Sequence, residues 1–97
     1  MASHKLTDQE QLEVTQTKLR KAEQQLRVLD RKVNQLEARY YRARRENRQA
    51  VYRSLRLQLT TLEGVWYAFS EYIFLKIEEE HDLMMKISRE SDQRQNR

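Results

Sequence analysis

The chain contains no cysteine, no proline and only one glycine, Gly64, among its 97 residues. Without cysteine there can be no disulfide framework and no thiolate chemistry. Glycine and proline mark most tight turns and loops, so their near absence argues against a sheet or a loop-rich fold. A phosphate-binding loop is excluded as well, because it needs several glycines. We therefore predict an all-α protein.

Long hydrophobic runs are also missing. The N-terminal segment MASHKLTDQEQ lacks the apolar run of a signal peptide. The longest apolar stretch, VWYAFSEYIFLKI (65–77), is too short to span a bilayer and contains a serine, a glutamate and a lysine. We expect no membrane insertion and a cytoplasmic or nuclear location.

Charge is abundant but unevenly distributed. Charged residues make up 35% of the chain, which is typical of long helices and coiled coils. The formal net charge is +4, yet residues 39–56 alone hold seven arginines and one glutamate, a net charge of +6. This basic segment could attract nucleic acid or an acidic polymer such as a microtubule, or it could be only a solvated helix face. The candidate residues of this acidic-partner surface are Arg42, Arg44, Arg45, Arg48, Arg53 and Arg56.

The first half of the chain has the pattern of a coiled-coil helix. Thr7 and Glu10 have the spacing of a capping box, which predicts a helix start at this point. From Leu12 onward, mostly apolar residues recur at the first and fourth positions of about five heptads. The predicted dimer seam is Leu12, Leu19, Ala22, Leu26, Leu29, Val33, Leu36, Tyr40, Ala43, Asn47 and Ala50.

The charges beside this seam favour a parallel homodimer. Lys18 and Glu23, and likewise Lys32 and Glu37, would pair between two parallel chains, whereas an antiparallel homodimer would pair like charges. Asn47 in the seam would fix the register. The alternative is an amphipathic helix packed on a different protein.

The second half is apolar over too much of its circumference for a simple seam. The heptad phase changes after residue 50, and seven large apolar residues lie off the new series. Such a helix needs more than one neighbour to bury it. We predict that it completes a bundle or docks a protein partner. The predicted interface is Leu55, Leu59, Leu62, Trp66, Phe69, Tyr72, Ile73, Phe74 and Ile77.

A turn is predicted at residues 60–64. Thr60 and Glu63 repeat the capping-box spacing, and Gly64 can adopt a positive φ. Folding back there would give a helical hairpin, and two hairpins in a dimer would form a four-helix bundle. The alternative is one continuous helix of roughly 80 residues, about 120 Å long. The predicted hairpin register brings Arg42, Arg44, Arg45 and Arg48 level with Glu78, Glu79, Glu80 and Asp82.

These signals divide the chain into segments. Residues 1–6 are a flexible N-terminus, 7–59 the coiled-coil helix, 60–64 the turn, 65–87 an aromatic-rich packing helix and 88–97 a flexible tail.

No motif in the chain predicts catalysis. Glu78 and His81 have the Glu-x-x-His spacing of di-iron bundles, but those sites need two such motifs and two further glutamates. No serine or threonine has a base placed to activate it. We expect no metal, no cofactor and no enzymatic activity. The prediction is a non-enzymatic coiled-coil assembly module that acts as adaptor or scaffold. The alternative is a basic module that binds nucleic acid or an acidic polymer through Arg39–Arg56.

Overall fold

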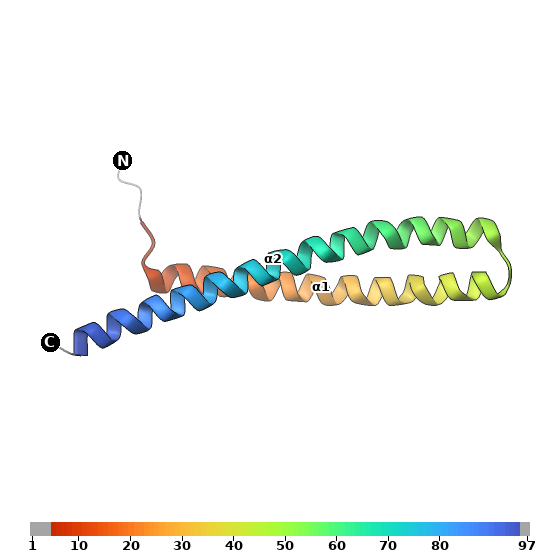
Figure 1. Cartoon of the computed structure of the whole chain (residues 1–97). Coiled ribbons are helices and arrows are strands. Elements are labelled where there is room, and N and C mark those ends of the chain that lie inside the picture. Colours follow the sequence, from red (N-terminus) through yellow and green to blue (C-terminus); the bar gives the residue numbers. More distant parts are fainter. Residues whose placement is uncertain (1–4, 96–97) are drawn as a thin grey trace.

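The computed structural model describes residues 5–95, and these form a helical hairpin. Helix α1 (Asp8–Arg45) and helix α2 (Gln49–Gln95) run side by side in opposite directions, so that both termini lie at the same end (Figure 1). The hairpin measures 74 × 35 × 15 Å. It confirms the predicted all-α hairpin and excludes the single continuous helix.

Helix α1 begins at the predicted capping box. The Thr7 hydroxyl accepts a hydrogen bond from the Glu10 amide at 3.1 Å, and the Glu10 carboxylate accepts one from the Thr7 amide at 3.3 Å. Asp8 and Glu10 occupy the first turn, and three arginines occupy the last one. Both placements complement the helix dipole, which favours acidic groups at the N-terminus and basic groups at the C-terminus.

The turn between the helices is built around Asn47. Its φ is 56°, the only positive φ of a non-glycine residue in the described part of the chain. The Arg48 amide donates to the Ala43 carbonyl at 2.9 Å, and the Asn47 amide donates to the Arg44 carbonyl at 3.2 Å. This pair of bonds is the Schellman motif, which ends a helix with one left-handed residue. Asparagine is among the few residues other than glycine that adopt this conformation readily.

The turn predicted at residues 60–64 is wrong, because α2 runs through this segment without interruption. The Thr60 and Thr61 hydroxyls donate to the carbonyls of Arg56 and Leu57 at 2.9 and 3.1 Å. These threonines therefore bond back to the preceding turn of their own helix instead of capping a new one. Gly64 has no positive φ. A break there would have interrupted the apolar seam of α2, whereas a turn at Asn47 leaves both seams whole.

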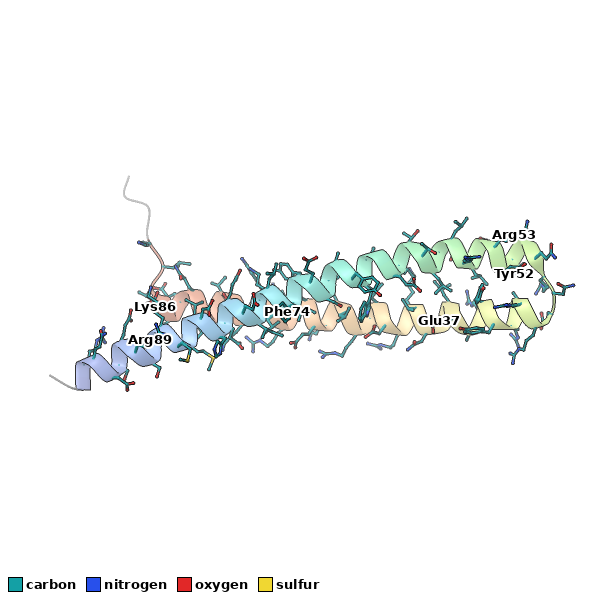
Figure 2. The ribbon with its side chains drawn as sticks, in the orientation of Figure 1. Glu37, Tyr52, Arg53, Phe74, Lys86 and Arg89 are labelled. Carbon is teal, nitrogen blue, oxygen red and sulfur yellow. The ribbon has the colours of Figure 1, made fainter. Side chains whose placement is uncertain are left out.

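Three contacts define how the helices are aligned. The rings of Tyr40 and Tyr52 lie 6.2 Å apart near the turn. In the middle, Trp66 Nε1 donates to an Asp30 carboxylate oxygen at 2.6 Å. At the open end, Lys86 Nζ donates to Asp8 at 3.2 Å; Lys86 lies beside the start of α1 in Figure 2. Residues at about the same distance from the turn therefore lie side by side.

This alignment contradicts the predicted pairing of the arginines with Glu78–Asp82. The arginines lie at the turn, where Arg53 also lies (Figure 2). Glu79 and Asp82 line a hollow together with Gln11 and Thr15 near the open end. The prediction assumed a turn some fifteen residues too late in the sequence, and every pairing derived from it shifted accordingly.

The core is the contact between two apolar seams. Leu36, Ala43, Leu55 and Leu59 form a buried cluster next to the turn. No large side chain in the described part of the chain is less than 2% exposed, because the hairpin is only one layer of helices thick. The other buried residues of α1 are Leu12, Thr15, Leu19 and Ala22.

The C-terminal segment differs from the tail expected there. Helix α2 includes residues 88–95, where the tail was expected to begin. Residues 1–4 and 96–97 lie outside the described residues.

Substitutions at Asn47 test the turn. We expect Asn47→Gly to retain the stability of the hairpin, because glycine adopts a positive φ without strain. Asn47→Val should lower the free energy of unfolding by about 1–3 kcal/mol, since a β-branched residue is strained in this conformation. Urea denaturation followed by circular dichroism measures both. Equal stability of the valine and glycine variants would contradict a left-handed turn at this position.

Gly64→Ala should stabilise the protein. A Cβ at this position meets no atom within 4 Å, and alanine is a better helix former by about 1 kcal/mol. The matched control is Ala38→Gly at an exposed position inside α1, which should lose a similar amount. A destabilising effect of Gly64→Ala in the same denaturation experiment would indicate a turn at Gly64.

Candidate functional site

The outer surface of α2 carries most of the exposed large apolar side chains. Leu57 is 71% exposed, Tyr67 69% and Phe74 60%. Contiguous apolar surface of this kind marks interaction sites. In α2 the exposed large apolar residues are Val51, Leu57, Val65, Tyr67, Tyr72, Phe74, Leu75, Ile77, Met84 and Met85.

Seven of these residues, together with Ala68, form two flanks on either side of the α2 seam. The aromatic flank consists of Tyr67, Phe74, Ile77 and Met84, which recur at helical spacing. The groove flank consists of Val65, Ala68, Tyr72 and Leu75, again three and four residues apart. Because the seam between these flanks faces α1, the flanks point away from each other, and one neighbour cannot cover both.

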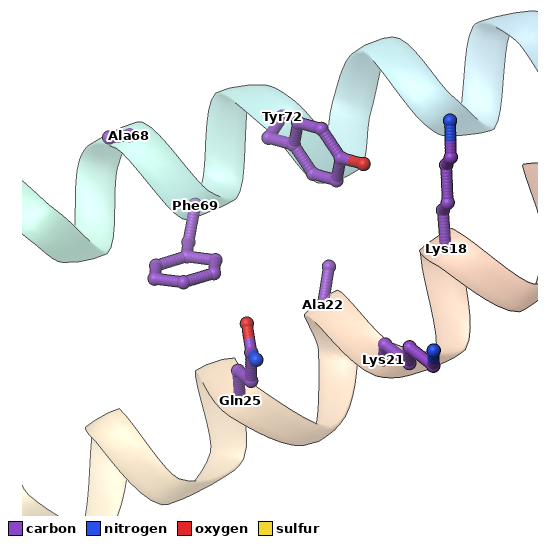
Figure 3. Close-up of a pocket in the computed structure, with 7 residues that line it drawn as sticks. All are labelled: Lys18, Lys21, Ala22, Gln25, Ala68, Phe69 and Tyr72. Atoms are coloured by element: carbon purple, nitrogen blue, oxygen red, sulfur yellow. The ribbon is translucent and has the colours of Figure 1, made fainter.

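A shallow groove runs along the hairpin beside the groove flank. Its first hollow, of about 380 Å³, is lined by Phe69 and Tyr72 of α2 and by Ala22 and Gln25 of α1. In Figure 3 the Phe69 ring points toward α1. A second hollow of about 580 Å³ shares Gln25 and Phe69 with the first. A third hollow, of about 320 Å³, continues from the second toward the turn. The groove therefore has a mostly apolar lining.

Lysines of α1 stand along the rim of this groove. Lys18 and Lys21 line the first hollow, and Lys32 lines the second and third. In Figure 3 the Lys18 side chain extends from α1 toward α2. The groove thus combines an apolar floor with a basic edge on the α1 side.

The predicted dimer seam is placed against α2 of the same chain. Leu12, Leu19, Ala22, Leu36 and Ala43 are buried, and the residues between them are half-buried. Two members do not belong to the seam. Asn47 forms the turn, and Ala50 is exposed at the beginning of α2. The heptad pattern identified the correct face of α1, but the face packs within the chain.

The predicted partner interface is split by the structure. Six of its residues belong to the seam that faces α1: Leu55, Leu59, Leu62, Trp66, Phe69 and Ile73. Tyr72, Phe74 and Ile77 are exposed on the two flanks. Sequence periodicity had already separated these groups, because the exposed residues lie off the second heptad series.

Polar residues interrupt the α2 seam toward the open end. Lys76 and Glu80 occupy seam positions and are half-buried. Lys76 Nζ donates to both carboxylate oxygens of Glu79 at 2.9 and 3.2 Å and lies 5.3 Å from the centre of the Tyr72 ring. The hydrogen bond to Glu79 raises the pKa of Lys76 above its ordinary value. Lys76 therefore keeps its charge while its aliphatic stem covers part of the seam.

The arginines predicted as an acidic-partner surface are all exposed around the turn. Arg42 and Arg48 lie 3.9 and 3.7 Å from the Glu46 carboxylate. Ion pairs this exposed contribute little to stability, about 0–1 kcal/mol. The turn gathers the arginines of α1 and α2 at one end of the molecule.

Neither the metal motif nor a membrane segment is supported in the described residues. Residues 5–95 include no group of three histidine or acidic side chains arranged to hold a metal ion, and Glu78 and His81 have no third ligand. Within the same range, neither helix combines the length and apolar character needed to cross a bilayer. Comparisons with protein-family models, curated proteins and solved structures find no match.

Proposed function

We propose that this protein is a non-enzymatic helical assembly module whose hairpins associate with one another through the outer surface of α2. One observation carries the proposal. Ten large apolar side chains of α2 are at least 40% exposed, even though the seam residues of the same helix are buried or half-buried against α1. A helix that is apolar on three sides needs neighbours beyond the one that its own chain provides.

Stacking of two closed hairpins is the arrangement that this surface favours. Two hairpins in contact form a four-helix bundle, in which an apolar layer would lie between the pairs of helices. Soluble assemblies are most often symmetric dimers of this kind. The predicted parallel coiled coil through Leu12–Ala50 is less favourable. It would require the hairpin to open and would expose Leu55 and Leu59, which α1 now covers.

The two flanks suit an adaptor or scaffold. A second hairpin that covers the groove flank leaves Tyr67, Phe74, Ile77 and Met84 outside the contact. A further helix with an apolar face could then pack on the aromatic flank, as amphipathic helices do in grooves of partner proteins. Self-association and partner binding would therefore use different sides of α2.

Leu75→Gln tests self-association. Leu75 is 50% exposed and lies on the groove flank, so the substitution should leave the hairpin folded and weaken association at least about tenfold. The control is Tyr41→Gln, which also removes an exposed apolar side chain, but from α1. Sedimentation equilibrium at micromolar concentration measures association, and circular dichroism checks helix content. A monomeric wild-type protein would refute the proposal.

A second candidate function follows from the arginines. The turn collects Arg42, Arg44 and Arg45 of α1 with Arg53 and Arg56 of α2 at one end, all exposed. Such a cluster could bind the phosphates of nucleic acid without sequence preference.

Fluorescence anisotropy with a labelled DNA duplex tests this candidate. Binding should weaken steeply as salt is raised from 50 to about 200 mM, because counterions are released from the phosphates. Absence of binding at the lowest salt concentration would exclude it.

A further inference from the structure

The aromatic flank of α2 is bordered by glutamates. Residues that are three or four positions apart on a helix are neighbours on its surface. The charged residues at this spacing from members of the aromatic flank are all acidic, and no lysine or arginine is among them. The apolar side chains of this flank therefore have only negatively charged neighbours on their own helix. These neighbours are Glu63, Glu71, Glu78 and Glu80.

Most of this negative charge is not neutralised within the chain. Glu63, Glu71 and Glu78 are exposed, and none of them forms an ion pair with another residue in the range 5–95. Lys76 of the same helix donates to Glu79 instead, at 2.9 Å. The three carboxylates are therefore available to another molecule.

Helix α1 adds a mixed set of charges on the same side of the hairpin. Asp30 marks this side, because it accepts the Trp66 indole N–H at 2.6 Å and the Trp66 ring lies 5.4 Å from the ring of Tyr67. Heptad spacing places two further acids and two arginines of α1 beside the flank. Acidic residues therefore remain in the majority. The charged residues that α1 contributes here are Glu13, Arg20, Glu23, Arg27 and Asp30.

The acidic stretch ends before the turn. Arg53 and Arg56 lie on the same side of α2, but they precede Tyr67 by eleven residues or more. At about 1.5 Å per residue, this separation is about 16 Å or more. The stretch from Glu63 to Glu80 is about 25 Å long, which is the length of a helix of about 17 residues. The flank therefore offers an acidic and apolar surface that matches one helix in length.

We propose that the aromatic flank binds an amphipathic helix of a partner protein in which lysines or arginines border the apolar face. This inference rests on the partner binding proposed for this flank and names the chemistry of the partner. The apolar side chains of the two helices would be buried between them, and the basic residues would face Glu63, Glu71 and Glu78. An acidic helix or an anionic lipid surface would place like charges together, which disfavours both.

Two matched peptides test the charge preference. The basic probe is a synthetic peptide of about 18 leucines and lysines, with the leucines at helical spacing on one face. The acidic probe has glutamate in place of each lysine. The protein should bind the basic probe at least about tenfold more tightly at about 100 mM salt, and this difference should shrink at about 1 M salt. Because the chain has a net charge of +4, only a local acidic surface would attract a basic peptide.

The emission of Trp66 reports where the probe binds. Trp66 is the only tryptophan of the chain, and its ring lies 5.4 Å from that of Tyr67 in the flank. Neither probe contains an aromatic residue. A change in tryptophan emission during the titration therefore measures binding close to the aromatic flank.

Charge reversal provides the first pair of variants. Glu71→Lys combined with Glu78→Lys should weaken binding of the basic probe at least about tenfold and favour the acidic probe. The matched control is Asp82→Lys combined with Glu90→Lys. It changes the net charge equally at exposed positions of α2 outside the flank, and should alter binding less than about threefold.

The apolar part of the contact needs a separate pair. Phe74→Gln should weaken binding of the basic probe at least about tenfold, because Phe74 is 60% exposed within the flank and aromatic side chains contribute strongly to interfaces. Leu57→Gln is the control. It also removes an exposed apolar side chain from α2, but about 25 Å away from Phe74, and should have less than about a threefold effect. Circular dichroism checks that each variant keeps its helix content.

The outcomes separate this inference from the proposed self-association. Equal binding of the two probes, or no effect of Glu71→Lys with Glu78→Lys, would overturn the basic partner and leave self-association untouched. Weaker self-association of Phe74→Gln in sedimentation equilibrium would assign the flank to a second copy and would also overturn it. A monomeric wild-type protein that still prefers the basic probe, with loss of binding in both flank variants, would support the basic partner while refuting self-association.

Discussion

The left-handed conformation of Asn47 fixes the alignment of the two helices, because α1 and α2 can pair only outward from the turn. The turn brings Leu36 and Leu59 together and sets Asp30 beside Trp66. The same turn leaves the arginines at one end of the hairpin and Glu79 and Asp82 near the other. A single backbone conformation thereby determines both the core and the distribution of charge.

A hairpin of two helices can bury one seam on each helix and nothing more. One seam is enough for the apolar surface of α1, because the outer face of this helix is largely polar apart from residues such as Val28 and Tyr41. Helix α2 has more apolar surface than one seam can bury, because both of its flanks are apolar. The excess is concentrated between Val65 and Met85, away from the turn. It is the physical reason to expect association.

Much of the fold could be predicted from local patterns. The capping box at Thr7 and both heptad series depend on neighbouring residues. The structure forms the capping box as predicted and places the apolar positions of both series, except Asn47 and Ala50, where the two helices meet. The off-seam residues, among them Leu57 and Phe74, are exposed as their spacing indicated. The turn could not be predicted from these patterns. Gly64 seemed the better turn residue, whereas Asn47 could be written as a seam position of a longer heptad series.

The sequence alone therefore determined that the chain is helical and which faces of its helices are apolar, because periodicity is a property of consecutive residues. Only the tertiary structure decided what each face contacts. The seam assigned to a second chain is covered by α2, and the arginines expected beside Glu78–Asp82 lie at the opposite end. The physical reason is that one left-handed residue is a small local signal. The position of that residue, however, shifts every long-range contact. It is decided by which turn allows the two apolar seams to pair along their length.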